Sequence, residues 1–577
     1  MKRVYMLMMV AAAMLACGPK DGVYTFHLLT TNDVHGRYFD SLYVKPDVRP
    51  SLVSVSSHVD SLRRMWGSEN VILVDAGDCL QGDNASYYYN FVDTTVVHLF
   101  ARMVDRIGYD AVIVGNHDIE TGHPVYDRVV SQMKAPFLAA NALDVQSGKP
   151  YFKEYVILKR HGLKIAVIGF TNSNIAGWLS PELWSGLEFR NLLPYAQEVV
   201  DRVRAKAKPD VVIVAAHTGA GEGDGLSLEN QGLDLFKSLS GVDFVVCAHD
   251  HRPRVELNDS ICMINSGSHC QNLGHGAISL TVKGGQVVSK TFEGALIPVD
   301  ARKSDAEMHS GFRSEFEAVR KFTKQELGEL KMDLCTRDAY VGMSDYLNLL
   351  HTLSLGCAPA QISFAAPLTF DGSVKAGTII YNDLFTLYPY ENQLFVVRMT
   401  GKEVKDALEY SYDKWINTMA PGQKHILKIK EGADPRTGTL NWSFVNRPYN
   451  FDSAGGLLYT VDITRPYGSR ITISSLADGT VFDETLEYNV AMTSYRANGG
   501  GGILKEGAGV DTGRIDDRVV KYYPEIRELL YKYLLEHKSI SSEAVGNYAL
   551  IGNWKFVPES LAASVLAADM DLLFPER

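Results

Sequence analysis

The hydrophobic pattern of residues 23–300 alternates between short apolar runs and longer stretches with helical spacing. The apolar runs are YTFHLL, NVILV, AVIVG, LKIAVIGF, DVVIVAA and VDFVVC. Nearly continuous apolar runs of this length are typical of strands that are buried on both faces of a sheet. Stretches such as LVSVSSHVDSLRRMW lie between the runs and predict helices. The alternation therefore predicts an α/β domain over residues 23–300.

The pattern changes after this domain. Residues 304–330 are charged, free of proline and apolar at helical spacing, so residues 301–332 are expected to be a linker helix that packs along one face. Residues 333–540 are richer in tyrosine and in turn signals, and they predict a second domain of the α+β class, with a helix beginning near Lys402. Residues 541–577 remain unassigned by pattern.

The first sixteen residues predict a signal peptide. Lys2 and Arg3 precede an apolar stretch at residues 4–16, which is too short to span a bilayer and is typical of an export signal. The stretch ends in MLAC, which resembles a bacterial lipobox. We therefore expect lipidation of Cys17, a short linker at residues 17–22, and export to the periplasmic or cell-surface side with a lipid anchor. The alternative is an ordinary cleaved signal with an incidental cysteine.

Composition narrows the choice of partners. The chain has 577 residues, a hydrophobic content of 46% and a net charge of −11. An acidic surface of this kind excludes a protein that coats a nucleic-acid polymer. Six further cysteines permit disulfides after export, and Cys262 with Cys270 is the closest pair, but spacing does not give the pairing.

Five of the apolar runs are followed directly by residue types that bind metals. Ligands bind at the carboxyl ends of strands in α/β sheets, so these residues are expected to meet at one edge. A single histidine at a strand end is usually a surface or core residue, and a single Asp-Gly pair is usually a turn. Five such positions together predict a site, and its candidate residues are Asp33, His35, Asp75, Asp78, Asn116, His117, Asp118, Glu120, His217, His249 and His251.

The residue types indicate the chemistry. Mixed ligation by Asp, Asn and His suits Zn, Mn, Co or Fe better than calcium. Two divalent ions about 3.5–4 Å apart would acidify a bridging water and hold a phosphoryl oxygen. The expected cofactors are therefore two divalent metal ions of undetermined identity.

The motifs DVHGR, DAGD, GNHD, HTG and AHDH together resemble the calcineurin-like metallophosphoesterases, in particular the bacterial nucleotidase family with a C-terminal substrate domain. The resemblance implies a sandwich of mixed β layers flanked by helices. It also implies that Asp78 bridges the two metals. Metal 1 would be held by Asp33, His35, Asp78 and His251, and metal 2 by Asp78, Asn116, His217 and His249.

The chain departs from the family pattern at two places. Ala248 stands where the family commonly has glycine, and GNHDIE replaces the usual GNHEFD. The resemblance implies that His117 faces the phosphate, with Glu120 as its carboxylate partner and Asp118 as the alternative. Asn116 would help to hold the non-bridging oxygens.

Two segments of the second domain, YNFDSAGG and SYRANGGGG, resemble the family's base-stacking segments. The resemblance places Phe451 and Tyr495 on either side of a planar base and includes Asn498 among the substrate-binding residues. Without the metal motifs, both aromatics could equally be core residues beside glycine turns.

The stretch ISFAAPLTFDGSVKAG has no arginine where family 5′-nucleotidases carry a GGxR-like segment. In this the chain looks like the 2′,3′-cyclic-nucleotide 2′-phosphodiesterase/3′-nucleotidase branch. We expect a monomer that acts on small nucleotides. The alternatives are a 5′-nucleotidase, a nucleotide-sugar hydrolase or, in another class, an inactive surface binding lipoprotein.

Overall fold

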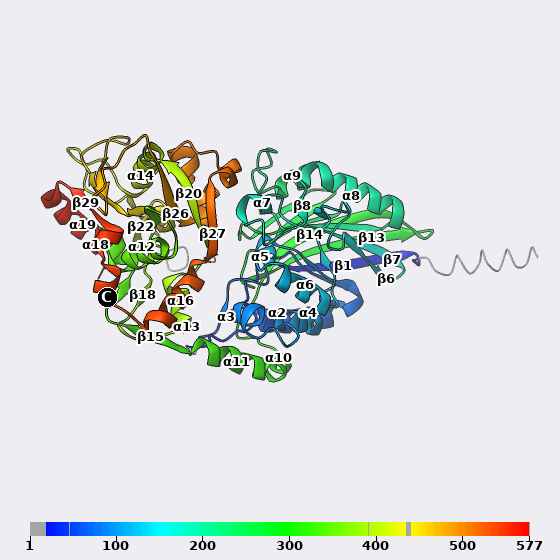
Figure 1. Ribbon diagram of the computed structural model, residues 1–577. Coiled ribbons are helices and arrows are strands. Elements are labelled where there is room, and N and C mark those ends of the chain that lie inside the picture. The colour runs from blue at the N-terminus through cyan, green and yellow to red at the C-terminus, as the bar shows by residue number, and fades with distance from the viewer. Residues whose placement is uncertain (1–18, 45–46, 391, 434–439, 576–577) are drawn as a thin grey trace, which may run out of the picture. The chain divides into compact units, whose positions relative to one another are not determined.

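The computed structural model describes residues 19–44, 47–390, 392–433 and 440–575 (Figure 1). The predicted signal peptide and Cys17 lie outside the described residues. Among the helices of the described part, none is both long and apolar enough to cross a membrane. The chain forms two compact units, Met1–Thr323 and Lys324–Arg577.

The first unit contains two six-stranded sheets. In the first sheet, β1 to β4 run parallel, and β13 and β14 extend it as an antiparallel pair. Its order is β14-β13-β1-β2-β3-β4. The strands are β1 (Gly22–Thr31), β2 (Val71–Asp75), β3 (Ala111–Ile113), β4 (Phe137–Leu138), β13 (Asn272–Lys283) and β14 (Gln286–Pro298).

The second sheet has the order β11-β12-β10-β9-β7-β6. Its four inner strands are parallel, and the strand at each edge is antiparallel to its neighbour. The strands are β6 (Tyr155–Arg160), β7 (Leu163–Phe170), β9 (Val211–Ala216), β10 (Phe244–Cys247), β11 (Arg254–Leu257) and β12 (Cys262–Asn265).

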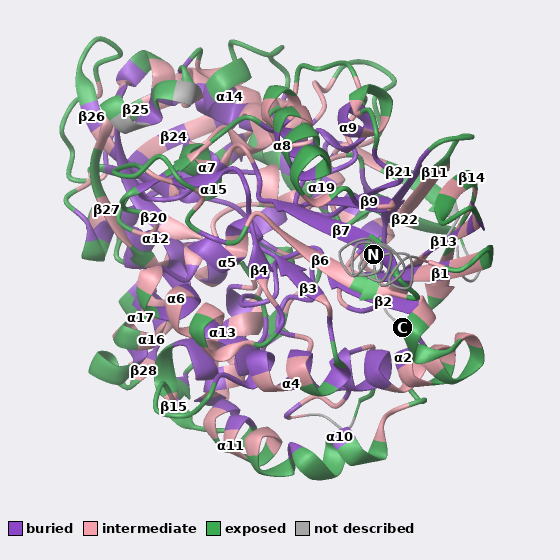
Figure 2. Cartoon of the chain, turned by 90° about the vertical axis from the view of Figure 1, so that its right-hand side faces the viewer, coloured by how far each residue is buried: buried purple, intermediate pink, exposed green. Residues whose placement is uncertain are grey.

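One apolar core joins the inner faces of the two sheets. It contains Phe26 and Val74 from the first sheet and Ile213 and Phe244 from the second, all buried. Strands β2, β3 and β9 are buried along their whole length (Figure 2), which explains their uninterrupted apolar sequences.

Helices cover the outer faces of both sheets. Separate buried clusters join helix residues to the outer side of each sheet. The helices are α2 (Leu52–Trp66), α4 (Leu99–Ile107) and α6 (His123–Gln132) on the first sheet and α8 (Leu192–Ala207) and α9 (Gly232–Ser238) on the second. The predicted sandwich of mixed β layers flanked by helices is confirmed.

The helix predicted over residues 304–330 is shorter in the structure and is interrupted. Helices α10 (Ala306–Gly311) and α11 (Arg313–Thr323) belong to the first unit. Residues Glu326–Leu330 form strand β15 instead, between β19 (Gly377–Ile380) and β28 (Ser539–Ile540). Pairing with two strands distant in sequence thus replaces the helix that the local pattern favoured.

The second unit is built around a five-stranded sheet of order β23-β17-β26-β20-β27. Helix α14 (Gly401–Trp415) begins where the pattern predicted, because Thr400 and Glu403 form a capping box. The other main elements are α12 (Asp345–Cys357), β17 (Ile362–Ala365), β20 (Gln393–Thr400), β23 (Ser453–Gly455), β26 (Glu487–Thr493) and β27 (Val519–Glu525).

The C-terminal residues, which the pattern left unassigned, belong to the second unit. Strand β29 (Gly552–Val557) pairs in parallel with β24 (Leu457–Asp462), and helix α19 (Glu559–Leu573) follows it. Asp569 of α19 is fully buried and accepts a hydrogen bond from the backbone N–H of Leu427 at 2.9 Å. The tail therefore completes the core of this unit.

The cysteines contribute no cross-link to the described part of the chain. All six that follow Cys17 are free, including Cys262 and Cys270.

Candidate metal centre

The predicted ligands follow β1, β2, β3, β9 and β10. All lie on loops except Asn116, which begins the short helix α5 (Asn116–Glu120). Five of them have a left-handed backbone, a conformation that residues with a side chain adopt rarely. These are Asp33 (φ 48°), His35 (φ 47°), Asp78 (φ 59°), His249 (φ 69°) and His251 (φ 58°). Such backbone strain is concentrated at functional sites, where the surrounding structure maintains it.

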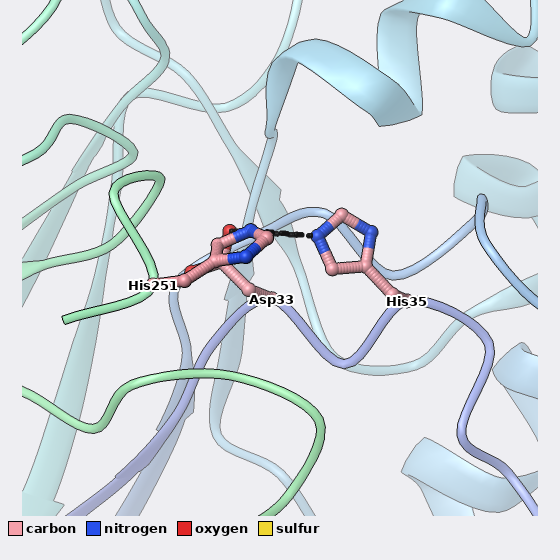
Figure 3. A group of neighbouring side chains, drawn as sticks. All are labelled: Asp33, His35 and His251. Carbon is pink, nitrogen blue, oxygen red and sulfur yellow. Dashed lines mark hydrogen bonds and ion pairs between the residues drawn. The ribbon is translucent and has the colours of Figure 1, made fainter. Parts of the chain in front are cut away.

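Asp33, His35 and His251 form a first group of side chains (Figure 3). The Nε2 atoms of the two imidazoles are 3.0 Å apart. Oδ1 of Asp33 lies 3.3 Å from Nε2 of His251 and 3.9 Å from Nε2 of His35. Three ligand atoms of suitable type thus converge on one point.

Asp78, His217 and His249 form a second group. Oδ2 of Asp78 is 3.0 Å from Nε2 of His217, and Oδ1 of Asn116 is 2.9 Å from Nδ1 of His249. Nδ1 of His217 lies 2.7 Å from the carbonyl oxygen of Ala76, so Nε2 faces the group. Asp78 stands in this second group, and its bridging role remains a prediction.

Three atoms in these groups fit the presence of cations. Oδ1 of Asp33, Oδ2 of Asp78 and Nε2 of His217 are buried, and the polar atoms that face them belong to other candidate ligands, His251 for Asp33 and each other for Asp78 and His217. Divalent cations would satisfy all three atoms, so the donor set fits the expected pair of metals.

The protonation preferences also suit cation binding. Burial alone would raise the pKa of Asp78, but His217 and His117 outweigh it and lower that pKa well below its usual range. Burial lowers the pKa of His35 to about 3, so its imidazole is neutral. Burial opposes the charge of His217, but Asp78 raises its pKa to about 9. A cation at this position would take the place of that proton beside Asp78.

His117 lies beside the first group, with its ring centroid 5.5 Å from that of His35. Nδ1 of His117 contacts a carboxylate oxygen of Glu120. Asp118 is instead fully buried and accepts hydrogen bonds from four backbone N–H groups, those of Asp78, Cys79, Leu80 and Gly115, at 2.8–3.0 Å. The structure therefore brings Glu120, rather than Asp118, to His117.

The other carboxylate among the sequence candidates, Asp75, does not join either group. It is fully buried, and it accepts hydrogen bonds from the hydroxyl of Thr31 and the backbone N–H of Gly77. Burial raises its pKa to about 7. Its contacts hold the loop that carries Asp78.

The prediction that Phe451 and Tyr495 lie on either side of a base is wrong for Phe451. Phe451 is fully buried and stacks on Trp415, with ring centroids 5.5 Å apart and an interplanar angle of 5°. It follows a short helical turn, Pro448–Asn450, which directs its side chain into the core. The alternative reading, a core aromatic, describes it correctly.

Tyr449, two residues earlier, lies next to Tyr495 instead. Their ring centroids are 6.1 Å apart and the rings meet edge to face at 86°. The ring centroid of Tyr390 lies 5.9 Å from that of Tyr449. Tyr495 is 40% exposed, so this cluster offers an aromatic surface. Asn498 is half-buried and caps the short helix that carries Tyr495.

A buried ion pair joins the two segments that carry these tyrosines. The guanidinium of Arg496 contacts both carboxylate oxygens of Asp452, at 2.5 and 2.8 Å. It also donates to the carbonyl oxygen of Tyr449 at 2.9 Å. Arg496 therefore holds the cluster together. The sequence pattern singled out the segment SYRANGGGG, which contains Arg496, but only the folded structure shows that Arg496 joins the two segments.

Comparison with known proteins agrees with the two-unit organisation. Residues 26–253 match the family model of the calcineurin-like phosphoesterases, and residues 322–506 match that of the 5′-nucleotidase C-terminal domain. The chain therefore contains one domain of each family. It is a metal-dependent phosphoester hydrolase.

Several curated proteins resemble this hydrolase over most of its length. The trifunctional nucleotide phosphoesterase protein YfkN of Bacillus subtilis is 23% identical over 91% of the chain, which spans only 38% of that relative. The 2′,3′-cyclic-nucleotide 2′-phosphodiesterase/3′-nucleotidase of Haemophilus influenzae is 24% identical over 92% of the chain and 87% of the relative. A 5′-nucleotidase of Vibrio parahaemolyticus is 24% identical over 70% of the chain and 77% of the relative.

Solved structures share the fold of the hydrolase. A Staphylococcus aureus protein in complex with alpha-ketoglutarate has a TM-score of 0.73 at 20% identity, covering 92% of this chain and 99% of its own. The 5′-nucleotidase precursor of Thermus thermophilus has a TM-score of 0.57 at 21% identity, covering 93% and 100%.

Three residues around the metal centre of the hydrolase are not marked by any of the sequence patterns. Glu229 and Trp178 contact His249, and the ring centroid of His269 lies 5.4 Å from that of His35. None of them follows an apolar strand run directly in the way the candidate ligands do. His269 has a left-handed backbone (φ 55°), which no sequence pattern reveals for a residue other than glycine.

Proposed function

We propose that this phosphoester hydrolase cleaves 2′,3′-cyclic nucleotides and 3′-nucleotides. The metal centre of the first unit is suited to a phosphoester, and the tyrosine cluster of the second unit is suited to a flat base; a nucleotide carries both groups. Stacking of a base on an aromatic side chain contributes roughly 1–3 kcal/mol and tolerates different bases. The exposed Tyr495 beside Tyr449 is the observation that carries the proposal of a nucleotide substrate.

The preference for the 2′,3′ edge rests on the arginines. No arginine occurs between Arg337 and Arg398. Arg337 itself pairs with Asp371 and lies over the ring of Phe574 at 4.4 Å. Arg496 is held by Asp452. Both arginines therefore have partners within the second unit other than a phosphate. Relatives named for the 2′,3′-cyclic activity also support a preference for the 2′,3′ edge.

Residues of the first unit would bind the metals and transfer the proton. Asp33, His35 and His251 would hold one divalent ion, Asn116, His217 and His249 would hold the other, and Asp78 would contribute to both. Bound ions would lower the pKa of water and polarise a phosphoryl oxygen. Glu120 orients the ring of His117 through Nδ1, and we assign proton transfer to the leaving alkoxide to Nε2. General acid catalysis of this kind contributes about 10²–10⁴-fold.

A 5′-nucleotidase is the alternative that a specific observation favours. Arg447 is exposed and lies close enough to Tyr390 to affect its pKa. A guanidinium at this position could bind the phosphate of a 5′-nucleotide. Relatives named 5′-nucleotidase support this alternative.

Side-by-side rates decide between the two substrate classes. The kcat/KM values for 2′,3′-cyclic AMP, 3′-AMP and 5′-AMP are measured with Zn, Mn, Co and Fe in turn. We expect the first two substrates to exceed 5′-AMP by at least tenfold. A higher value for 5′-AMP, lost in Arg447→Ala, would replace this proposal with the 5′-nucleotidase.

We also propose that the hydrolase is exported and anchored through lipidated Cys17, since MLAC follows an apolar stretch of signal-peptide length. The wild-type protein should then fractionate with membranes, and Cys17→Ser should release it or leave it unprocessed. Identical soluble fractions for both forms would contradict the anchor.

A further inference from the structure

His249 is held on three sides. Nδ1 faces Oδ1 of Asn116 at 2.9 Å, and Nε2 faces Oε1 of Glu229 at 2.9 Å. The indole of Trp178 stacks on the imidazole, with centroids 5.1 Å apart and an interplanar angle of 17°. One nitrogen is thus directed to the second ligand group and the other to a carboxylate outside it.

We infer that Glu229 is the positioning residue of the second metal site. A histidine that binds a metal through one nitrogen is oriented by the partner of its other nitrogen, and a carboxylate partner also makes the ring a better donor. When Nε2 donates its proton to Glu229, Nδ1 keeps its lone pair, and Nδ1 and Oδ1 of Asn116 then face each other as two potential ligand atoms. This inference rests on the proposed two-metal function and adds a residue that the ligand motifs do not contain.

The backbone of Glu229 is fixed to the same site. Nδ2 of Asn172 donates to the carbonyl oxygens of both Glu229 (3.1 Å) and His217 (3.2 Å). The hydroxyl of Thr218 also donates to the carbonyl oxygen of Glu229 at 2.7 Å. Asn172 is fully buried, so the loop that carries Glu229 is tied to the loop that carries another ligand of the second group.

The carboxylate of Glu229 contacts His249, a candidate ligand of the second group. In the first group, His251 is oriented by Asp33, which is itself a candidate ligand. Loss of the Glu229 carboxylate should therefore weaken one metal site and leave the other intact.

Glu229 lies at the edge of the core, and this makes the inference testable. Its side chain is 46% exposed and lines a cavity of about 780 Å³ together with Glu222, Asp224 and Arg252. A substitution at such a position removes a contact without opening the core, so the fold is expected to survive. Glu222 lines the same cavity and serves as a matched control for the loss of a carboxylate.

The test measures metal binding without any nucleotide. Wild type, Glu229→Ala, Glu229→Gln and Glu222→Ala are freed of metal and titrated with Co²⁺, and the metal bound per chain and the visible absorption are recorded. Wild type and Glu222→Ala should bind two ions per chain. Glu229→Ala should bind the second ion 10–100-fold more weakly and keep the first. Glu229→Gln should lose less, because its amide oxygen still accepts from Nε2.

Three results would overturn the inference. They are unchanged binding of both ions by Glu229→Ala, equal weakening of both ions, and the same loss in Glu222→Ala. Binding that follows the expected pattern in a protein that cleaves no nucleotide would contradict the proposed function alone. Circular dichroism and the unfolding midpoint should be the same in all four proteins.

Discussion

Replacing Asp118 with Asn should destabilise the first unit, whereas replacing Glu120 with Gln should slow turnover. The two carboxylates are two residues apart but have different partners. Asp118 accepts from four backbone N–H groups, and these hydrogen bonds tie the loop that carries Asp78 to helix α5, which carries Asn116. Glu120 contacts the imidazole of His117.

The magnitude follows from the hydrogen bonds. Each carboxylate oxygen of Asp118 accepts two of the four bonds. An asparagine amide group would replace one oxygen with a donor and lose two charge-assisted bonds, at about 1.5–3 kcal/mol each. Relief of the buried charge, which already raises the pKa of Asp118, offsets part of this loss. The net destabilisation should be roughly 2–4 kcal/mol, or about 4–8 °C at the roughly 2 °C per kcal/mol of a large unit.

Calorimetry of the full chain, with and without added metal, measures this shift, because metal raises the transition of the unit that binds it. Glu120→Gln is the matched control. The free energy of unfolding of Glu120→Gln should stay within about 1 kcal/mol of the wild-type value. Its kcat should fall by roughly 10–100-fold, because His117 loses its orienting partner. The reasoning is refuted if Asp118→Asn unfolds like wild type and loses only kcat, since Asp118 would then be the partner of His117.

Three further predictions follow from the described geometry. Asp78→Asn should bind less metal and lose nearly all turnover, and EDTA should inactivate the wild type; full activity after thorough chelation would contradict the two-metal reading. Tyr449→Ala and Tyr495→Ala should each weaken nucleotide binding by about 1–3 kcal/mol and leave the hydrolysis of bis-p-nitrophenyl phosphate unchanged. Phe451→Ala should instead lower the free energy of unfolding by about 3–5 kcal/mol. A Phe451→Ala variant that is stable but binds nucleotides weakly would show that Phe451 stacks on the base. Burial lowers the pKa of His351 to about 3, so below pH 6.5 the unfolded chain binds a proton that the folded chain excludes. The second unit should lose about 2 kcal/mol between pH 6.5 and 4.5, and His351→Gln should remove this slope in urea unfolding.

The metal centre was largely predictable because its residues follow a rule of topology. Parallel strands end at a common edge, so side chains that come directly after buried runs meet there. Asp33, Asp78, Asn116, His217 and His249 each follow such a run, and the structure brings them into two groups with His35 and His251. The order of these residues along the chain was sufficient for this expectation.

The base-binding residues were less predictable because their segment is irregular. Phe451 and Tyr449 are two residues apart, and in a strand they would share a face. Tyr449 lies instead within a short helical turn, Pro448–Asn450, and Phe451 follows it, so Phe451 enters the core and Tyr449 reaches Tyr495. Sequence pattern does not fix side-chain direction in a turn of this kind.

The sequence by itself determined the strand runs, the ligand types at their ends and the boundary of helix α14, because these depend on spacing within a few residues. Tertiary structure alone decided the partner of His117, the strand at Glu326–Leu330, the place of the C-terminal tail and the role of Glu229. Each of these outcomes depends on contacts between residues far apart in the chain or on the backbone conformation of a loop. Tertiary structure also decided the strained backbone of the ligands, because the packed sandwich holds Asp33 and His35 in a left-handed conformation.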